Sequence, residues 1–344
     1  MGFTKECFRI MTKVLLTGAT GFVGSSLANI LVEKSMGVKA LVRRFDTKLA
    51  SGIKQVSVGD FNQLRNIYIR ADIGNSDSLS IKNQIHCTME GIDVVIHTAA
   101  RVHIMKDKSV DPLTEFRKLN RDVTLALAQI SVEAGVERFV FLSSIKVNGE
   151  STIPGKPFTA DDQPNPTDPY GLSKWETEVG LQQLAKDTGM EVVIIRPPLV
   201  YGPGVKANFR SMMRWVSLGV PLPLGAINNQ RSLVALDNLV DLIVTCIEHP
   251  AAANQTFMAG DGEALSTTEL LQRIGRALGK PAQLIPVPAS LLIFIASLLG
   301  KKAVARRLCG SLQVDISKTR ELLGWEPPVS VDEGLRRTAE EFKN

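Results

Sequence analysis

The sequence predicts an α/β protein in which a parallel sheet is covered by helices on both faces. From residue 13 to about residue 197, short apolar runs alternate with helical patterns, and this alternation is typical of parallel sheets. The runs are rich in Val, Ile and Leu, as expected of strands that are buried on both faces. After Pro197 the pattern changes to a mixture of strands and helices, which predicts a smaller mixed α/β lobe.

The strands and helices of the first part follow in order along the chain. Strand patterns occupy residues 13–18, 38–43, 92–99, 138–144 and 191–197. Helical patterns occupy residues 25–34, 113–134 and the segment after Tyr170. A further strand is expected between residues 50 and 90, where "KQVSVGDF" at 54–61 and "IYIRADI" at 67–73 are both candidates.

The later part of the chain shows the start signals of separately packed helices. Ser266 with Glu269, and Ser330 with Glu333, have the spacing of capping boxes. We therefore expect two domains and a short extension. The predicted ranges are 12–197 for the sheet domain, with 231–249 as a segment that could return to it, 198–344 for the smaller lobe and 1–11 for the extension.

Composition and charge argue against nucleic-acid binding, a cysteine metal site and a disulfide framework. The excess of 40 Lys and Arg over 35 Asp and Glu gives a net charge of +5 that is spread along the 344 residues. Such a distribution suits an anionic small molecule better than a nucleic acid. The four cysteines lie far apart without a Cys-x-x-Cys pair, so neither a metal site nor a disulfide framework is expected. A reducing cytoplasm fits this usage.

Two segments have features of targeting or membrane elements. The run "LLIFIASLLG" at 291–300 is about half as long as a membrane-spanning helix, and we expect it to be a buried helix rather than a membrane-surface element. The first ten residues lack the apolar stretch of a secretory signal. No membrane partner is therefore expected.

A glycine-rich turn marks a phosphate-binding site. Gly18, Gly21 and Gly24 stand between an apolar strand and an amphipathic helix, with Phe22 and Val23 inside the motif. Glycines permit a tight turn and let backbone amides approach a pyrophosphate at the helix N-terminus. This order of strand, glycines and helix predicts a Rossmann-type dinucleotide-binding domain.

The end of the second strand indicates which dinucleotide binds. An acidic residue at this point favours NAD, whereas arginine accommodates the extra phosphate of NADP. Here the strand ends in Arg43 and Arg44, without a carboxylate before Asp46. We expect NADP(H), with NAD(H) as the alternative.

Contacts to the adenine are expected at the end of the third strand. The candidates are Asp72 and Ile73, and the rival pair is Asp60 and Phe61.

Three side chains suit proton transfer beside the cofactor. Ser144 ends a predicted strand, at the edge where open α/β sheets bind ligands. Tyr170 and Lys174 are four residues apart, so they share one face of a helix, and we expect the lysine to lower the pKa of the tyrosine. A hydroxyl, a phenol and an ammonium can together move the proton of a carbinol oxygen during hydride transfer.

The combined motifs resemble the extended short-chain dehydrogenase/reductase family, in its nucleotide-sugar epimerase, dehydratase and reductase branch. The likeness covers the chain from about Lys13 to its end, through "TGATGFVG", "HTAA", "KLNRDVT", "LSSIKVNGE", "PYGLSK", "RPPLVYGPG" and "LLGWEPPVSVDEGL". The resemblance implies that Ser144 binds the substrate oxygen, with Tyr170 as acid/base and Lys174 as its partner. It further implies a cofactor lined by Ala99, Ala100 and Pro197, and a structural role for Asn120.

In this branch the smaller lobe holds a nucleoside diphosphate. The resemblance implies that Asn208 and Arg231 contact the diphosphate, and that Arg307 or its neighbour Arg306 supplies a second guanidinium. A UDP-sugar is accordingly the expected substrate. The two segments 113–134 and 169–187 are similar to the helices through which the family forms a homodimer, so a homodimer is expected.

Residues at two places in the chain narrow the choice among the reactions of this branch. Dehydratases of the branch usually carry Asp-Glu directly after the active-site hydroxyl, where this chain has Ile145 and Lys146. The arginines of the second strand favour an NADPH-dependent reductase of a UDP-4-keto-6-deoxy-N-acetylhexosamine. The alternative is a UDP-glucose or UDP-N-acetylglucosamine 4-epimerase, and a non-catalytic NADP-sensing scaffold comes third because Tyr170 and Lys174 are both present.

Overall fold

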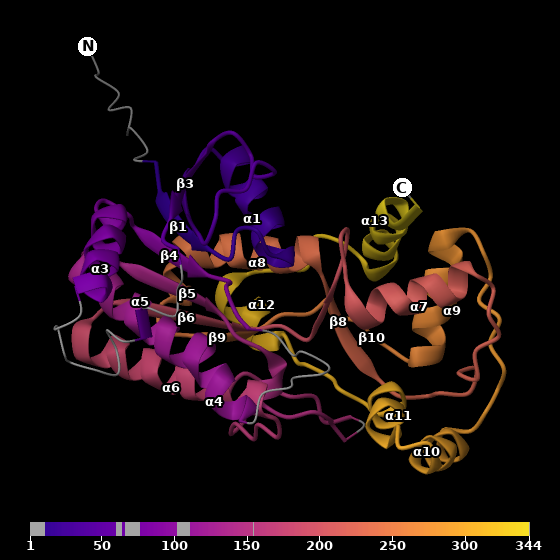
Figure 1. The fold of residues 1–344 in the computed structure, drawn as a ribbon. Helices are drawn as coiled ribbons and strands as arrows, with labels where there is room; N and C mark the ends of the chain where they lie inside the picture. The colour runs from indigo at the N-terminus through magenta and orange to yellow at the C-terminus, as the bar shows by residue number, and fades with distance from the viewer. Residues whose placement is uncertain (1–10, 60–63, 66–75, 102–110, 154, 344) are drawn as a thin grey trace.

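The computed structural model describes residues 11–59, 64–65, 76–101, 111–153 and 155–343. Its centre is a seven-stranded sheet in the order β3-β2-β1-β4-β5-β6-β9 (Figure 1). All neighbouring strands of this sheet are parallel. The strands are β1 (Lys13–Thr17), β2 (Gly37–Val42), β3 (Ile53–Ser57), β4 (Val94–His97), β5 (Arg138–Leu142), β6 (Glu191–Arg196) and β9 (Thr256–Met258).

Helices cover both faces of this sheet, which confirms the predicted Rossmann-type fold. One apolar core joins the sheet to α1 (Phe22–Glu33), α8 (Leu236–Glu248) and the segment around α12 (Ser317–Leu323). The other core joins it to α3 (Ser76–Met89), α5 (Val123–Glu133) and α6 (Pro169–Thr188). Alternate residues of one strand enter opposite cores, as Leu15 and Leu16 of β1 do, because strand side chains alternate between faces.

The long helix expected at 113–134 is continuous but contains a π-helical turn. It consists of α4 (Pro112–Phe116), the turn η1 (Arg117–Asp122) and α5. Asp111 starts α4 by accepting a hydrogen bond from Thr114 N at 3.2 Å. Such turns insert one residue into the helical repeat and often occur at functional sites.

The third strand of the sheet is β3, which overlaps the first of the two sequence candidates. It pairs with β2 in parallel, with Val38 opposite Ile53 and Val42 opposite Ser57. The rival candidate at 67–73 lies outside the described residues.

A smaller mixed sheet follows in the order β10-β8-β7. Residues 231–249 are divided between the two parts, because β8 belongs to the small sheet while α8 packs on the large one. Three helices pack with the small sheet around a separate apolar core. The elements of this part are β7 (Leu199–Tyr201), α7 (Ala207–Ser217), β8 (Arg231–Ala235), β10 (Ala264–Leu265), α9 (Thr267–Leu278) and α13 (Val331–Lys343).

Both expected helix starts are present. The Ser266 hydroxyl accepts a hydrogen bond from Glu269 N at 3.0 Å, and the Ser330 hydroxyl accepts one from Glu333 N at 3.3 Å. The short 3₁₀ turn η3 (Pro250–Ala252) follows α8. Cys87, Cys246 and Cys309 are free thiols.

The prediction of a buried helix at 291–300 is wrong. The segment forms α10 (Ala289–Leu298), which is followed by α11 (Lys302–Cys309), and none of the residues of α10 is buried. The two helices lie together at one end of the smaller lobe (Figure 1). Apolar composition predicted burial, whereas the large apolar side chains on one side of α10 are exposed. Among the described residues, no helix combines the length and apolar character needed to cross a membrane.

Candidate active site

Two hydroxyl groups meet at the carboxyl ends of the central strands. Ser144 lies just after β5 and caps the 3₁₀ turn η2 (Ile145–Val147). Tyr170 is the second residue of α6, which Asp168 starts by accepting a hydrogen bond from Gly171 N at 2.6 Å. The Ser144 hydroxyl lies close enough to the Tyr170 hydroxyl to lower the pKa of the phenol. The structure thus brings together the serine and the tyrosine that the sequence indicated.

Lys174 is buried one helical turn after Tyr170. Its Nζ donates a hydrogen bond to the carbonyl oxygen of Leu142 at 2.9 Å and lies 4.4 Å from the centre of the Phe141 ring. Burial lowers the pKa of Lys174 to about 7, although the carboxylate of Glu178 raises it in part. Near neutral pH the side chain is therefore close to its titration midpoint.

The expected effect of Lys174 on the tyrosine is wrong in this structure. Burial raises the pKa of Tyr170 to about 12, and the hydrogen bond with Ser144 offsets only part of this rise. Lys174 Nζ instead donates to the Leu142 carbonyl oxygen, and burial disfavours its charged form. Tyr170 is consequently a protonated phenol at neutral pH, which is the proton-donating form.

A buried ion pair beside Lys174 was missed in the sequence. Glu178 lies one turn after Lys174, and its Oε2 is 2.5 Å from Nη2 of Arg196 on β6. Ser143, the residue before Ser144, donates a hydrogen bond to the same carboxylate. Arg196 also donates to Oδ1 of Asn148 at 3.1 Å. The repeat of four residues from Tyr170 through Lys174 to Glu178 is the signal that could have revealed this group.

Asn120 connects the loop after β4 to α6. Its Oδ1 accepts a hydrogen bond from Arg101 N at 2.8 Å, and its Nδ2 donates to the carbonyl oxygen of Arg101 at 3.1 Å. The same Nδ2 donates to Ser173 Oγ at 3.1 Å, and Thr177 Oγ1 donates to the carbonyl oxygen of Asn120 at 2.9 Å. These contacts fit the structural role that the resemblance implied for Asn120.

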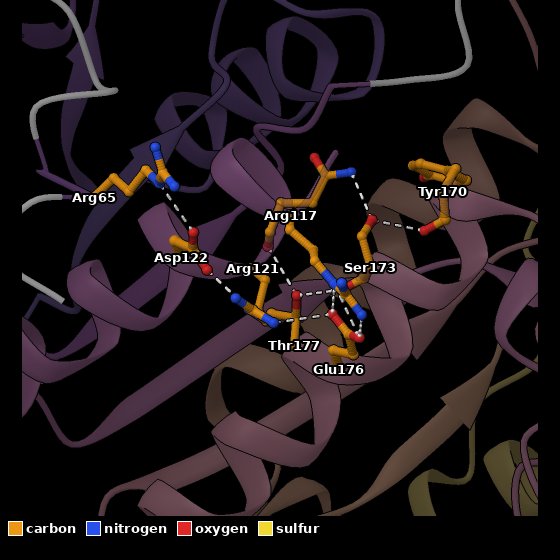
Figure 2. Close-up of polar contacts among 9 residues, drawn as sticks. Arg65, Arg117, Arg121, Asp122, Tyr170, Ser173, Glu176 and Thr177 are labelled. Carbon is orange, nitrogen blue, oxygen red and sulfur yellow. Dashed lines mark hydrogen bonds and ion pairs between the residues drawn. The ribbon is translucent and has the colours of Figure 1, made fainter. Parts of the chain in front are cut away.

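Charged side chains fasten the same helices on their outer side (Figure 2). Arg117 Nε donates to Glu176 Oε2 at 2.8 Å, and Arg121 Nη1 lies 3.2 Å from the same oxygen. Asp122 accepts from Arg65 Nε at 3.2 Å. The π-helical turn η1 therefore holds the outer face of α6, while Tyr170 and Lys174 occupy its inner face.

The glycine turn has the close packing that a dinucleotide site requires. Gly18 has a φ of +77°, and an added Cβ would lie 2.6 Å from Ala99 N. A Cβ on Gly24 would lie 2.1 Å from the carbonyl oxygen of Gly18. Gly21 is the N-cap of α1, whose first turn contains no acidic residue. These residues fit a pyrophosphate at the positive end of α1, where Phe22 and Val23 supply the first helical amides.

The cofactor residues predicted after β4 and β6 lie beside this turn and beside Ser144. Ala99 and Ala100 follow β4 directly, and Ala99 is next to Gly18. Pro197 is buried after β6, and its carbonyl oxygen accepts a hydrogen bond from Ile145 N at 3.0 Å.

The end of β2 presents two exposed arginines. Arg43 and Arg44 follow Val42, and neither forms an ion pair within the described residues. Asp72 and Ile73, like their rivals Asp60 and Phe61, lie outside the described residues.

The predicted diphosphate ligands are only partly brought together. Arg231 at the start of β8 donates through Nη1 to the carbonyl oxygens of Arg307 at 2.8 Å and Gly310 at 3.1 Å. Arg306 and Arg307 are exposed in the last turn of α11, and Asn208 is exposed in the first turn of α7. Arg231 therefore ties the end of α11 to the small sheet.

Comparisons with known proteins agree with this arrangement. The family model described as "NAD dependent epimerase/dehydratase family" matches residues 14–260. A UDP-glucose 4-epimerase of Vibrio cholerae is 49% identical over 96% of this chain and 95% of its own length. A UDP-glucose 4-epimerase of Mycolicibacterium smegmatis is 30% identical over 96% of this chain and 99% of its own length.

Solved structures share the fold. A UDP-glucose 4-epimerase of Thermotoga maritima with UDP-glucose has a TM-score of 0.73, 24% identity and coverage of 96% of this chain and 99% of its own. A UDP-glucuronic acid 4-epimerase of Bacillus cereus with NAD has a TM-score of 0.74, 21% identity and the same coverages of 96% and 99%. The glycine turn, the Ser144–Tyr170 contact and the matched family model together show that this chain belongs to the NAD-dependent epimerase/dehydratase family of short-chain dehydrogenase/reductase enzymes.

Proposed function

We propose that this enzyme transfers a hydride at C4 of a UDP-linked hexose or N-acetylhexosamine. The observation that carries the proposal is the proximity of the Ser144 and Tyr170 hydroxyls, with Lys174 one turn away, at the sheet edge that also holds the glycine turn. Two hydroxyls and an amine in this arrangement suit a reaction that moves a proton on a sugar oxygen.

The residues of the glycine turn would hold the cofactor, with Gly18, Gly21 and Gly24 at the pyrophosphate. A bound nicotinamide supplies or accepts the hydride. Ser144 hydrogen-bonds the reacting sugar oxygen, and Tyr170 donates its proton to that oxygen as the carbonyl is reduced. Lys174 in its charged form stabilises the phenolate that remains. Arg231 and Arg307 would contact the diphosphate, because guanidinium groups suit phosphate oxygens. Asn208 would contact it through its side-chain amide.

For the direction of the reaction we propose reduction of a UDP-4-keto-6-deoxy-N-acetylhexosamine by NADPH. Arg43 and Arg44 support NADPH, since both are exposed at the ribose end of the predicted cofactor site and carry no ionic partner in the described part of the chain. The pKa of about 12 for Tyr170 supports reduction, because the phenol begins as a proton donor. Ile145 and Lys146 stand where dehydratases place two carboxylates, which argues against dehydration.

The second candidate is UDP-glucose 4-epimerase with NAD. The observation that favours it is the relative of that name in Vibrio cholerae, which is 49% identical along nearly the whole chain. An epimerase oxidises C4 and then returns the hydride, so it uses no net cofactor.

Product analysis separates the two candidates. Purified protein is incubated with an enzymatically made UDP-4-keto-6-deoxy-N-acetylglucosamine and either NADPH or NADH, and separately with UDP-glucose, UDP-galactose and UDP-N-acetylglucosamine. The reductase consumes one NADPH for each keto-sugar reduced and leaves the UDP-hexoses unchanged. Interconversion of UDP-glucose and UDP-galactose without net change in cofactor would overturn the reductase proposal and establish the second candidate.

A further inference from the structure

The hairpin of α10 and α11 exposes an apolar surface that the proposed reaction does not use. Five large side chains of residues 291–299 are 45–74% exposed. They occur at positions i, i+3, i+4, i+7 and i+8, which is the spacing of one helix face. The five residues are Leu291, Phe294, Ile295, Leu298 and Leu299. We call this set the α10 face.

The opposite side of α10 holds the hairpin to the protein. Leu292 and Ala289 pack against the apolar core of the small sheet. At the other end of the hairpin, Arg231 donates to the carbonyl oxygens of Arg307 and Gly310 at 2.8 and 3.1 Å. The hairpin is therefore attached to the lobe through one side, and the five side chains of the α10 face are exposed. Figure 1 shows α10 and α11 together at one end of the lobe.

Only positive charge flanks this face along the chain. Residues 281–314 contain four basic residues and no Asp or Glu, which gives a local charge of +4. All four basic residues are exposed, and none forms an ion pair among the described residues. They are Lys301, Lys302, Arg306 and Arg307. Net charge over the remaining 310 residues is only +1, since the total is +5.

We propose that the hairpin docks the protein onto the surface of an anionic phospholipid bilayer. The α10 face supplies Leu, Ile and Phe, and the start and end of the following helix α11 supply Lys and Arg; apolar and basic side chains are the two kinds that bind the headgroup region of a bilayer. The basic residues attract anionic headgroups, and the absence of acidic residues removes repulsion from the same surface. Ten residues are too few to span a bilayer, so the contact is peripheral.

The proposal is tested by flotation of the full-length protein with vesicles at physiological salt. One vesicle contains phosphatidylcholine alone, and the other contains about one third phosphatidylglycerol. We expect the protein to float with the anionic vesicles and to remain unbound with the neutral ones. Phe294→Ser with Leu298→Ser should lower the bound fraction at least tenfold, and Lys301→Gln with Lys302→Gln should lower the partition coefficient about fivefold per lysine.

Matched variants control for the loss of exposed apolar or basic residues in general. Leu79→Ser changes a leucine that is 40% exposed on α3, and Lys34→Gln with Lys186→Gln removes two exposed lysines elsewhere. These variants should bind like the original protein, and melting curves should show that every variant is folded. The proposal is overturned if the original protein stays unbound with anionic vesicles, or if the α10 variants bind as well as the controls. It is also overturned if the α10 variants instead convert a dimer to a monomer, because a second copy then covers the face.

Discussion

At the residue scale, two neighbouring side chains have pKa values that are moved in opposite directions by the same cause. Burial disfavours the charged form of each group, so it raises the pKa of Tyr170 to about 12 and lowers that of Lys174 to about 7. The helical spacing of the two residues therefore predicted their proximity but not their electrostatics. Burial depends on the whole fold, so the spacing of two residues does not predict it.

Loss of the Tyr170 hydroxyl should abolish most of the turnover. Tyr170→Phe removes the proposed proton donor, and we expect kcat to fall by about 10²–10⁴-fold. Tyr201→Phe is the matched control, because its hydroxyl donates to Asp261 at 2.9 Å within the small lobe. That variant should lose stability but retain kcat. Unchanged turnover in Tyr170→Phe would instead favour the non-catalytic scaffold.

Glu178 should act as a positioning residue through the charge of Lys174. Its carboxylate raises the pKa of the lysine, so Glu178→Gln should lower that pKa further. Because the charged lysine is the form that stabilises a phenolate, the decline of kcat at high pH should begin at lower pH. The variant should also lose about 3–5 kcal/mol of unfolding free energy, since Arg196 keeps its charge without a buried partner.

Glu176→Gln is the control for this shift. Glu176 lies two residues earlier on the outer face of α6, where it binds Arg117 and Arg121. Neutralising Glu176 should leave the pH dependence of kcat unchanged, although its contacts with Arg117 and Arg121 weaken. Identical pH profiles for the two variants, recorded with melting curves, would show that Glu178 has only a structural role.

At the scale of elements, the sequence predicted the parts that depend on local patterns. The five strand patterns correspond to β1, β2, β4, β5 and β6, because buried parallel strands are continuous apolar runs. The third strand stayed open between two segments, since apolar composition alone does not show which of them pairs with β2. The prediction that the helix at 291–300 is buried was wrong for a related reason, because composition does not show which parts of the protein cover a helix.

The candidate site was predictable to a similar extent. Ser144, Tyr170 and the glycines follow from motifs that keep a fixed spacing. The pairs Glu178–Arg196 and Asn120–Ser173 join residues 18 and 53 positions apart, so tertiary folding alone brings them together. Their contacts are visible only in the structure.

In the turn between β1 and α1, an added methyl group should destabilise the protein far more at Gly24 than at Gly21. An added Cβ at Gly24 lies 2.1 Å from the Gly18 carbonyl oxygen and 2.9 Å from Thr98 Oγ1, so the helix must move away from the strand. We expect Gly24→Ala to lower the unfolding free energy by at least about 1–3 kcal/mol. The same variant should also lose its affinity for the cofactor. Gly21→Ala, with its nearest atom at 3.1 Å, should stay folded. Melting curves and titration with NADPH measure both quantities, and equal stabilities would contradict the packing argument.

At the scale of the whole molecule, apolar side chains are exposed both on the small lobe and on a helix of the large sheet, and we compare one surface from each part. One is the α10 face of the small lobe. The other is centred on Val179, which is 49% exposed in the middle of α6, with half-buried Trp175 one turn earlier. The sequence segments 113–134 and 169–187, which the resemblance linked to a homodimer, form the helices around Val179. We therefore propose that a second copy of the chain covers α6 and not α10.

A charge placed in each surface distinguishes these assignments. Val179→Glu should place a carboxylate inside the dimer contact, where an unpaired buried charge is strongly unfavourable, so the protein should become a monomer. Leu298→Glu, at a side chain that is 74% exposed on α10, should leave the dimer intact. Light scattering coupled to gel filtration gives the mass of each variant directly. A dimer that survives Val179→Glu and dissociates with Leu298→Glu would move the subunit contact to the hairpin, and a monomeric original protein would remove the dimer altogether.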